Sequence, residues 1–286
     1  MEISSAAPLV SIITPNYNYE KFIGETIHSV LNQDYPNIEY IVVDGGSTDN
    51  SLDIIQTISD NNPGSIRLIK QKDAGQSESL NTGFKKSNGE ILCWLNSDDL
   101  LEPSAISIIV NFLNRNKDID MVFGERIDID GKGNILRINR GSFWGKYHFR
   151  FHQPNAQEVS FWRRDIFFDS GLINESYQFC MDYDLFIRFS KIGKISFLPI
   201  HLGYYRYHAE AKSVKVYEKK WKSGNEEIDR MFTEHYGRLP SKIIKNLLSL
   251  RLSRYICGLY WRMIRLKDTT IAEQIRTNGY LDIYSK

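Results

Sequence analysis

The chain has 286 residues, of which 42% are hydrophobic, 13% aromatic and 25% charged, and its formal net charge is +1. These proportions are ordinary for a soluble globular protein and exclude the disordered and fibrous classes. The sequence has no run of about 18 uncharged apolar residues, no secretory signal pattern and only three distant cysteines (Cys93, Cys180 and Cys257), so we expect neither a membrane span nor disulfides, and a cytoplasmic protein.

Short apolar, β-branched runs alternate with stretches of helical spacing along the first half of the chain. The expected strands cover residues 9–14, 38–44, 66–69, 91–95 and 121–123, and the expected helices cover residues 20–31, 49–58, 77–86 and 104–115. This alternation is typical of parallel β-α-β units in a layered α/β sheet. Ligands of such sheets bind beyond the carboxyl ends of the strands, so we expect a site in the segments that follow them.

Polar and acidic residues follow the first four expected strands. They are residues 14–18, Asp44, residues 73–76 and residues 96–99. The chain contains no glycine-rich dinucleotide fingerprint, P-loop or esterase nucleophile elbow, which argues against those classes of enzyme. An acidic edge needs a cation to bind phosphate, and the adjacent carboxylates of Asp98 and Asp99 suit Mg²⁺ or Mn²⁺. The alternative for this segment is a turn with a helix cap before Pro103.

Four motifs occur in order along the chain: T-P-N-Y-N at Thr14, V-V-D-G-G-S-T-D at Val42, D-A-G-Q-S-E-S-L-N-T-G at Asp73 and G-E-I-L-C-W-L-N-S-D-D at Gly89. Together they resemble the glycosyltransferase family 2 enzymes, and the likeness runs from about residue 10 to residue 213. The resemblance implies the GT-A fold, a Rossmann-like, mostly parallel mixed sheet flanked by helices. It also implies an inverting, metal-dependent transfer of a sugar from a nucleotide diphosphate sugar, above all a UDP-sugar, to a hydroxyl group of a glycan. We expect a catalytic domain over residues 1–213 and a helical C-terminal extension over residues 214–286.

The resemblance assigns the donor nucleotide sugar to these motifs. The donor contacts that it implies are Thr14, Pro15, Tyr17, Asp44, Asp73, Gln76 and Asn96. It implies Asp98 as a ligand of Mg²⁺ or Mn²⁺ on the diphosphate, with Asp99 beside it as a further ligand. Two positions depart from the family pattern, because Gly45 stands where a second aspartate is often found and Asn96 stands where the D-x-D turn often begins with aspartate. The negative charge that Asn96 lacks weakens the expectation of tight metal binding.

A second acidic cluster opens an expected helix at Met181. Asp182 lies near its start, where the helix dipole favours an anion, so a capping role is one interpretation. Asp184 and Arg188 have the spacing of an i,i+4 ion pair. Family 2 enzymes often carry Glu-Asp here, with the second residue as general base, and the resemblance implies that role for Asp182. The base would accept the proton of an acceptor hydroxyl as it attacks the anomeric carbon.

Two later segments resemble the acceptor side and the close of the family's catalytic domain. The resemblance implies Glu158 as a partner of an acceptor hydroxyl and Trp162 as a surface that stacks on a sugar, although a core position is an open alternative for Trp162. The sequence Y-R-Y-H that ends at His208 follows an expected strand over residues 195–198 and resembles the family's Y-R-x-H. It implies that Arg206 binds the diphosphate and that His208 adds a ligand to the metal or the diphosphate.

Charge is distributed unevenly along the chain. Residues 1–99 carry 6 basic and 14 acidic side chains, a balance of −8, whereas residues 212–267 carry 14 basic and 5 acidic side chains, a balance of +9. Residues 241–267 have helical spacing and no acidic side chain, and four arginines share one side of the helical wheel: Arg251, Arg254, Arg262 and Arg265. Such a stretch can lie on an anionic membrane or pack on the catalytic domain. The first interpretation predicts a peripheral protein at the inner face of a membrane, close to a lipid-linked acceptor.

The sequence leaves two other classes of protein open. A sugar-phosphate nucleotidyltransferase also combines an α/β sheet with a metal, but it usually carries a glycine-rich basic loop where this chain has T-P-N-Y-N. A non-catalytic nucleotide- or glycan-binding module is favoured by Asn96 and Met181, which stand where the family often has acidic residues. We expect the partners to be a nucleotide sugar and a glycan or lipid-linked glycan of surface polysaccharide assembly, and not a nucleic acid.

Overall fold

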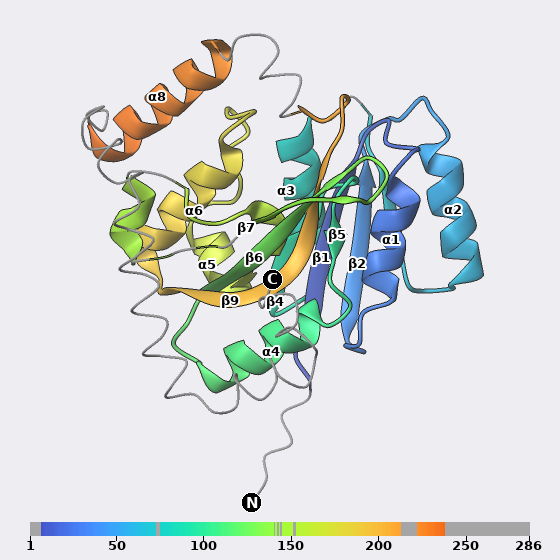
Figure 1. Cartoon of the computed structure of the whole chain (residues 1–286), viewed down its shortest axis with the longest axis horizontal. Coiled ribbons are helices and arrows are strands. Elements are labelled where there is room, and N and C mark those ends of the chain that lie inside the picture. The colour runs from blue at the N-terminus through green and yellow to red at the C-terminus, as the bar shows by residue number, and fades with distance from the viewer. Residues whose placement is uncertain are drawn as a thin grey trace, which may run out of the picture.

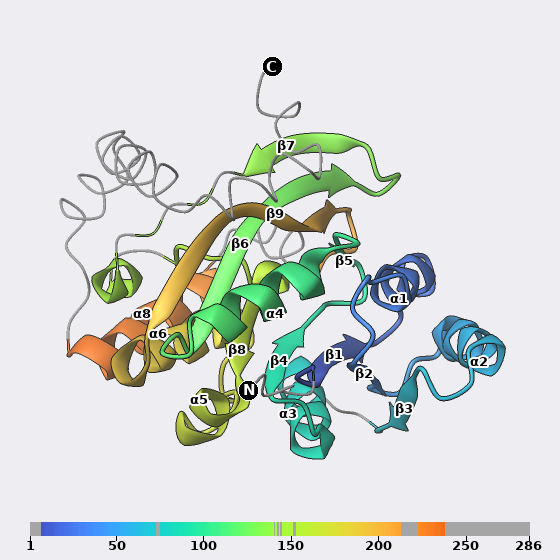
Figure 2. The ribbon, with the colours of Figure 1, turned by 90° about the horizontal axis from the view of Figure 1, so that it is seen from below.

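The computed structural model describes residues 7–72, 75–139, 141, 143, 145–150, 153–212 and 222–237. Within these residues nine strands form one sheet in the order β3-β2-β1-β4-β8-β6-β9-β5, and β7 pairs with β6. Helices cover both faces of the sheet (Figure 1, Figure 2). The predicted layered α/β architecture is confirmed.

The N-terminal half builds the parallel part of the sheet. Its strands are β1 (Val10–Asn16), β2 (Ile38–Asp44), β3 (Arg67–Lys70) and β4 (Ile91–Trp94), and its helices are α1 (Ile23–Leu31), α2 (Ser51–Asn61) and α3 (Gln76–Lys86). Every residue of β1 and β4 is buried, because helices cover both faces, and this explains their continuous apolar sequences. Since these strands are parallel, their carboxyl ends meet at one edge, where Asn16 lies opposite Asp44.

The second half adds the mixed part of the sheet. Its strands are β5 (Leu100–Leu101), β6 (Met121–Asp130), β7 (Ile135–Asn139), β8 (Ser160–Arg163) and β9 (Ile195–Tyr207), and its helical segments are α4 (Ala105–Arg115), the 3-10 turns η1 (Lys146–Arg150) and η2 (Gln157–Val159), α5 (Arg164–Asp169) and α6 (Met181–Ile192). β8 runs antiparallel to both β4 and β6, whereas β6 and β9 are parallel. β8 therefore joins the parallel half to the mixed half.

β6 and β9 are longer than the sequence analysis indicated, since it assigned only residues 121–123 and 195–198 to strands. In the missed part of β6, the buried residues Ile127 and Ile129 alternate with charged residues. An alternation with a period of two residues is the signature of a strand, so the signal was present in the sequence.

The long strands bend where they pair with each other. The register of β6 with β9 shifts on both sides of Glu125, and such irregularities bend and twist a strand. A Cβ atom on Gly124 would lie 2.7 Å from the backbone carbonyl oxygen of Ile200, so a glycine is needed for this close approach. The bend brings the C-terminal part of β9 to β5, which follows the carboxyl end of β4 in the chain (Figure 2).

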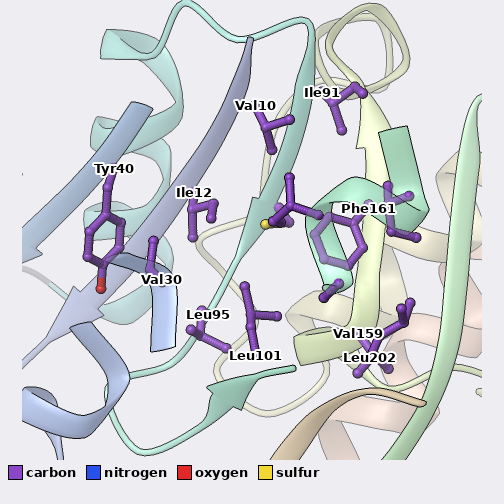
Figure 3. Close-up of a cluster of buried hydrophobic side chains, with 14 of the residues drawn as sticks. Val10, Ile12, Val30, Tyr40, Ile91, Leu95, Leu101, Val159, Phe161 and Leu202 are labelled. Atoms are coloured by element: carbon purple, nitrogen blue, oxygen red, sulfur yellow. The ribbon is translucent and has the colours of Figure 1, made fainter. Parts of the chain in front are cut away.

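Two hydrophobic clusters, one on each face, hold the layers together. The first packs α1, α2 and α4 on the sheet, and Figure 3 shows part of it around Ile12 and Phe161. The second contains Ile13 and packs α3, α5, α6 and α8 (Lys222–Tyr236), with Met231 and Phe232 from α8. Ile12 and Ile13 belong to different clusters because successive residues of a strand point to opposite faces.

β7 forms the outer strand of a hairpin with β6. Its other edge carries no strand in the part of the chain that the structure describes. Ile135 is 62% exposed and Leu136 is 56% exposed. Among the described residues, the hairpin thus presents apolar side chains to solvent beside an edge that pairs with no strand.

Among the described residues, no helix has both the length and the apolar character needed to span a bilayer. The predicted arginine-bearing stretch 241–267 lies outside these residues, and so does the predicted domain boundary between residues 213 and 214. α8 falls in the predicted extension and is helical. The division of the chain into two domains stays a prediction.

Candidate active site

Asp44 ends β2 and is 1% exposed. Its carboxylate accepts hydrogen bonds from Asn16 Nδ2 at 2.7 Å, from Ser47 Oγ at 2.6 Å, and from the backbone N–H groups of Gly46 and Ser47 at 3.0 and 2.8 Å. An ionised carboxylate offers about four acceptor positions, and these bonds use that capacity. Asp44 therefore shapes the turn after β2, and a donor base or ribose would have to displace one of these partners. Asp73, predicted nearby, lies outside the described residues.

The three predicted residues of the first motif have different surroundings. Thr14 is fully buried, and its hydroxyl shares a hydrogen bond of 3.0 Å with the hydroxyl of Tyr40, so its side chain faces the core. Pro15 is also buried, and its carbonyl oxygen accepts a hydrogen bond from Ser97 Oγ at 2.6 Å, which ties β1 to the acidic turn. Tyr17 is 55% exposed just after β1, so its ring is open to a ligand.

The acidic turn after β4 separates its two aspartates. Asp99 is fully buried, its Oδ1 accepts the backbone N–H of Arg206 at 3.1 Å, and its Oδ2 accepts a hydrogen bond from Asn96 Nδ2 at 3.2 Å. Burial, with the nearby charges of Asp98 and Glu158, raises the pKa of Asp99 well above its usual range. This differs from the expectation of a metal ligand, because the bent β9 engages the carboxylate inside the protein.

Asp98 pairs with His208 instead. Its Oδ2 lies 3.0 Å from His208 Nε2, and the two side chains are 12% and 8% exposed. The imidazole ring packs against the rings of Phe22 and Tyr19, with centroids 4.4 and 5.9 Å away. Among the described residues, no group of three His, Cys, Asp or Glu side chains could hold a metal by itself. The carboxylate of Asp98 suits a Mg²⁺ or Mn²⁺ ion that takes most of its ligands from substrate phosphates and water, and the imidazole of His208 is a ligand that Mn²⁺ accepts more readily than the harder Mg²⁺.

Arg206 secures the acidic turn from β9 and is 1% exposed. Its Nε donates to the carbonyl oxygen of Asp98 at 3.0 Å, and its Nη2 donates to Glu25 Oε2 at 2.5 Å. The guanidinium group lies over the ring of Phe22, 5.0 Å from the centroid. The sequence analysis expected Arg206 to bind the donor diphosphate, whereas these contacts hold its guanidinium within the protein. Arg206 therefore positions the turn.

Asn96 is the centre of a hydrogen-bonded chain across the site. Its Oδ1 accepts a hydrogen bond from Gln76 Nε2 at 2.9 Å, and its Nδ2 donates to Gln157 Oε1 at 2.8 Å. Lys212 Nζ donates to Gln76 Oε1 at 3.1 Å and to the carbonyl oxygen of Gln178 at 2.6 Å. These hydrogen bonds connect the acidic turn to the start of α3 and to the segment before α6.

Asp182 lies in the first turn of α6 and is half-buried. Its Oδ2 accepts a hydrogen bond from Gln153 Nε2, and its Oδ1 accepts the backbone N–H of Tyr183, both at 2.8 Å. Burial is the main cause that raises the pKa of Asp182, and the charge of Glu158 adds to it. A higher pKa makes the ionised carboxylate a stronger base.

Asp184, two residues later, is held by side chains of the protein itself. It accepts hydrogen bonds from Arg188 Nη2 and His235 Nε2, both at 2.7 Å. Burial raises its pKa, but the bonds and charges of His235 and Arg188 outweigh burial and bring the pKa below its usual value. The predicted ion pair of Asp184 with Arg188 is confirmed, and His235 extends it to α8.

Glu158 is a buried carboxylate in η2, a turn that contacts β5 and β9, and its side chain bonds Arg126. It is 4% exposed, and its Oε1 accepts a hydrogen bond from Arg126 Nη1 at 2.8 Å. Its charge raises the pKa of both Asp99 and Asp182, so it lies within electrostatic reach of each. The start of α3 links the acidic turn to the start of α6, because Gln76 bonds Asn96 and the neighbouring Ser77 Oγ donates to Met181 Sδ at 2.8 Å.

Residues 11–193 match the family model described as glycosyl transferase family 2. The chain belongs to this family. A chondroitin synthase of Escherichia coli is 31% identical to this family 2 chain over 250 residues, which are 82% of the chain and 34% of that protein. An uncharacterized glycosyltransferase of Haemophilus influenzae is 30% identical over 243 residues, which are 80% of the chain and 74% of that protein. The chain thus spans about a third of the length of the chondroitin synthase.

Solved structures resemble the fold of this family 2 chain. The S. aureus protein TarS 1-349 in complex with UDP-GlcNAc superposes with a TM-score of 0.62 at 20% identity, over 72% of this chain and 60% of that one. The mannosyltransferase PcManGT from Pyrobaculum calidifontis, in complex with GDP-Man and Mn²⁺, superposes with a TM-score of 0.61 at 16% identity, over 98% of this chain and 82% of that one. The predicted GT-A fold is confirmed.

Trp162 of this family 2 chain lies in the core. It is fully buried, and its ring packs with those of Phe84, Trp94 and Phe189. Its strand, β8, is an inner strand between β4 and β6. This differs from the expectation that Trp162 stacks on an acceptor sugar and agrees with the alternative of a core position.

The sequence analysis missed Arg126 and Lys212. Arg126 bonds Glu158, pairs with Asp128 through Nε and Oδ1 at 3.0 Å, and lies over the ring of Tyr205, 4.5 Å from the centroid. An arginine among buried carboxylates offsets their mutual repulsion. Arg126 could have been found from the alternating stretch that it begins. Lys212 carries no comparable signal, because its partners come from distant segments.

Proposed function

We propose that this family 2 chain is an inverting glycosyltransferase that moves a sugar from a UDP-sugar to a hydroxyl group of a glycan in polysaccharide assembly. The observation that carries the proposal is that the acidic turn, with its Asp98–His208 pair, is linked through Gln76 and Ser77 of α3 to Met181, the residue before Asp182. Transfer from a diphosphate sugar needs a centre for the leaving phosphates and a base for the acceptor, and these residues supply both. The chondroitin synthase relative and the nucleotide sugars in the neighbouring structures favour this substrate class.

On the donor side, the exposed ring of Tyr17 and the turn shaped by Asp44 would receive the nucleotide, with Asn96 and Gln76 facing its ribose and phosphates. Asp98 and His208 would hold a Mg²⁺ or Mn²⁺ ion. When bound, such an ion neutralises the charge that develops on the departing nucleoside diphosphate.

On the acceptor side, Asp182 is the proposed general base. It accepts the proton of the acceptor hydroxyl as the new C–O bond forms on the face of the sugar opposite the nucleotide, so the configuration inverts. Gln153 and the backbone of Tyr183 each bond one carboxylate oxygen and fix the side chain. The buried carboxylate of Glu158 is the proposed partner of a second acceptor hydroxyl.

The variant Asp182→Asn tests this role, with the exposed Asp165→Asn as matched control. The assay is release of UDP from UDP-sugars, UDP-GlcNAc among them, with Mn²⁺ and chondroitin oligosaccharides as acceptors. We expect Asp182→Asn to lower kcat by about 10²–10⁴-fold with donor KM within about twofold, because an amide cannot take the proton. Asp165→Asn should keep both values, and a near-wild-type kcat in Asp182→Asn would remove Asp182 from the role.

The products of the same reaction separate the three classes of protein that the sequence left open. A glycosyltransferase releases UDP and extends the acceptor. With pyrophosphate added, a nucleotidyltransferase converts the UDP-sugar to UTP and a sugar 1-phosphate, and a binding module forms no product. Formation of UTP without sugar transfer would overturn the proposal.

A further inference from the structure

The segment before α6 is capped by a side chain from another helix. α6 begins after Cys180, whose side chain makes no capping hydrogen bond. Glu227 of α8 supplies the acceptor, since its Oε1 accepts the backbone N–H groups of Gln178, Phe179 and Cys180 at 3.0, 2.6 and 2.9 Å. Amides at a helix start lack partners within the helix and favour a negative charge. Glu227 therefore fixes the three residues that lead into α6.

Glu227 is held in its charged form. Burial raises the pKa of Glu227, but the hydrogen bonds from the three amides outweigh burial and bring the pKa below its usual value. From another side of the same segment, Lys212 donates to the carbonyl oxygen of Gln178 at 2.6 Å. The segment is thus bonded at its amides by one charged side chain and at a carbonyl by another.

Other side chains of α8 form hydrogen bonds with the residues just before this segment. The hydroxyl of Tyr177 donates to Glu234 Oε2 at 2.6 Å, and Arg230 Nη2 donates to the carbonyl oxygen of Ser176 at 2.8 Å. The guanidinium group of Arg230 also lies over the ring of Tyr177, 4.8 Å from the centroid. Phe232, which is 2% exposed, anchors the helix in the core.

We propose that Glu227 is a positioning residue for Asp182, and that α8 belongs to the framework of the active site. Asp182 follows Cys180 by two residues, so the direction of its carboxylate depends on the amides that Glu227 holds. This inference rests on the proposed role of Asp182 as the general base. A positioning role predicts a loss of turnover in molecules that are folded and bind the nucleotide, whereas a merely structural role predicts fewer such molecules.

The test compares Glu227→Ala, Glu227→Gln and the control Glu226→Ala, at an exposed neighbour, in the full chain. Turnover is expressed per UDP-binding site, counted by calorimetric titration with UDP and Mn²⁺. We expect Glu227→Ala to lower kcat by about 10- to 100-fold at unchanged donor KM, because small displacements of a reacting group are costly. Glu227→Gln keeps one acceptor oxygen and should recover part of that loss, and Glu226→Ala should match the wild type.

Hydrogen exchange of the amides in residues 177–183 is a second readout, independent of activity. Exchange there should be faster in Glu227→Ala than in the wild type, and unchanged in Glu226→Ala. Should Glu227→Ala fail to fold, Glu227→Gln carries the test, with exchange and kcat both displaced in the same direction by smaller amounts.

Two kinds of failure are distinguishable. Unchanged exchange at residues 177–183, or a wild-type kcat in the Glu227 variants while Asp182→Asn is inactive, overturns the positioning role and leaves the proposed function standing. An active Asp182→Asn variant overturns the role of Asp182 as general base, and with it the role of Glu227 in positioning that base.

Discussion

Asp98 and Asp99 are adjacent residues with different partners. Asp98 pairs with His208, and Asp99 accepts the backbone N–H of Arg206. The sequence analysis named both as metal ligands, because an acidic pair after a buried strand does not reveal which carboxylate turns inward. That choice depends on β9, whose Arg206 lies 107 residues beyond Asp99 in the chain.

The same substitution at these two positions should therefore have different effects. Asp98→Asn is expected to weaken the binding of UDP in the presence of Mn²⁺ by about tenfold or more, because the proposed ion loses its carboxylate. Asp99→Asn should keep most of the response to Mn²⁺, since the carboxylate of Asp99 is buried and bonds Arg206 and Asn96 within the protein. The measurement is the rise in Tm with UDP and Mn²⁺ over UDP alone, and an equal rise in both variants would contradict the assignment.

The raised pKa of Asp182 predicts opposite effects on activity and stability. The base must be ionised, so kcat should fall as the pH drops through the raised value. The folded protein favours the protonated carboxyl, because its pKa is raised above the unfolded value of about 3.9. The stability that this provides is fully present at a pH below the unfolded pKa and is lost as the pH rises through the folded pKa. Asp182→Asn should consequently melt at or above the wild-type temperature at about pH 7, with no advantage at about pH 4. Calorimetry checks this, and a clearly lower Tm at neutral pH would speak against it.

At the scale of the elements, strands buried on both faces were the easiest to predict. β1, β2 and β4 are short apolar runs between helices, and the sequence analysis found each of them. β5, with two residues, and β8 were missed because pairing with distant strands, and not their own composition, makes them strands. The bend of β6 and β9 could not be predicted for the same reason, and it decides where Arg206 and His208 lie.

Arg206→Lys should weaken the contacts that hold the acidic turn against β9. Lysine keeps the charge but loses the planar group that bonds Asp98 and Glu25 together. We expect the free energy of unfolding to fall by about 1–3 kcal/mol and the binding of UDP with Mn²⁺ to weaken. Arg115→Lys, at an exposed side chain at the end of α4, is the control and should stay within about 0.5 kcal/mol of the wild type. Equal denaturation midpoints for the two variants would exclude this role.

At the scale of the whole molecule, the two halves of the sheet contribute different parts of the candidate site. The parallel half carries the proposed donor residues, which the ordered motifs made predictable. The other half carries Asp182, which the resemblance located, and also Arg126, Lys212 and Glu227, which act through partners far away in the chain. The contacts of Glu227 are set by the packing of α8 on α6, and no local pattern encodes them.

We propose that residues 241–267 bring the enzyme to an anionic membrane surface. The full chain should sediment with vesicles that contain phosphatidylglycerol and not with neutral phosphatidylcholine vesicles. Each arginine near such a surface contributes about 1 kcal/mol, so changing the four arginines to glutamine should lower binding by about 100-fold or more. The substituted residues are Arg251, Arg254, Arg262 and Arg265. Equal sedimentation of both proteins would favour packing of this stretch on the catalytic domain.

The hairpin of β6 and β7 has a consequence for handling the protein. Within the part of the chain that the structure describes, β7 has one edge that pairs with no strand and exposed apolar side chains such as Ile135 and Leu136, and such an edge is a template to which another strand can add. In concentrated stocks we expect this edge of β7 to promote self-association. Dilute storage, or a lysine introduced in β7, should prevent the protein from aggregating.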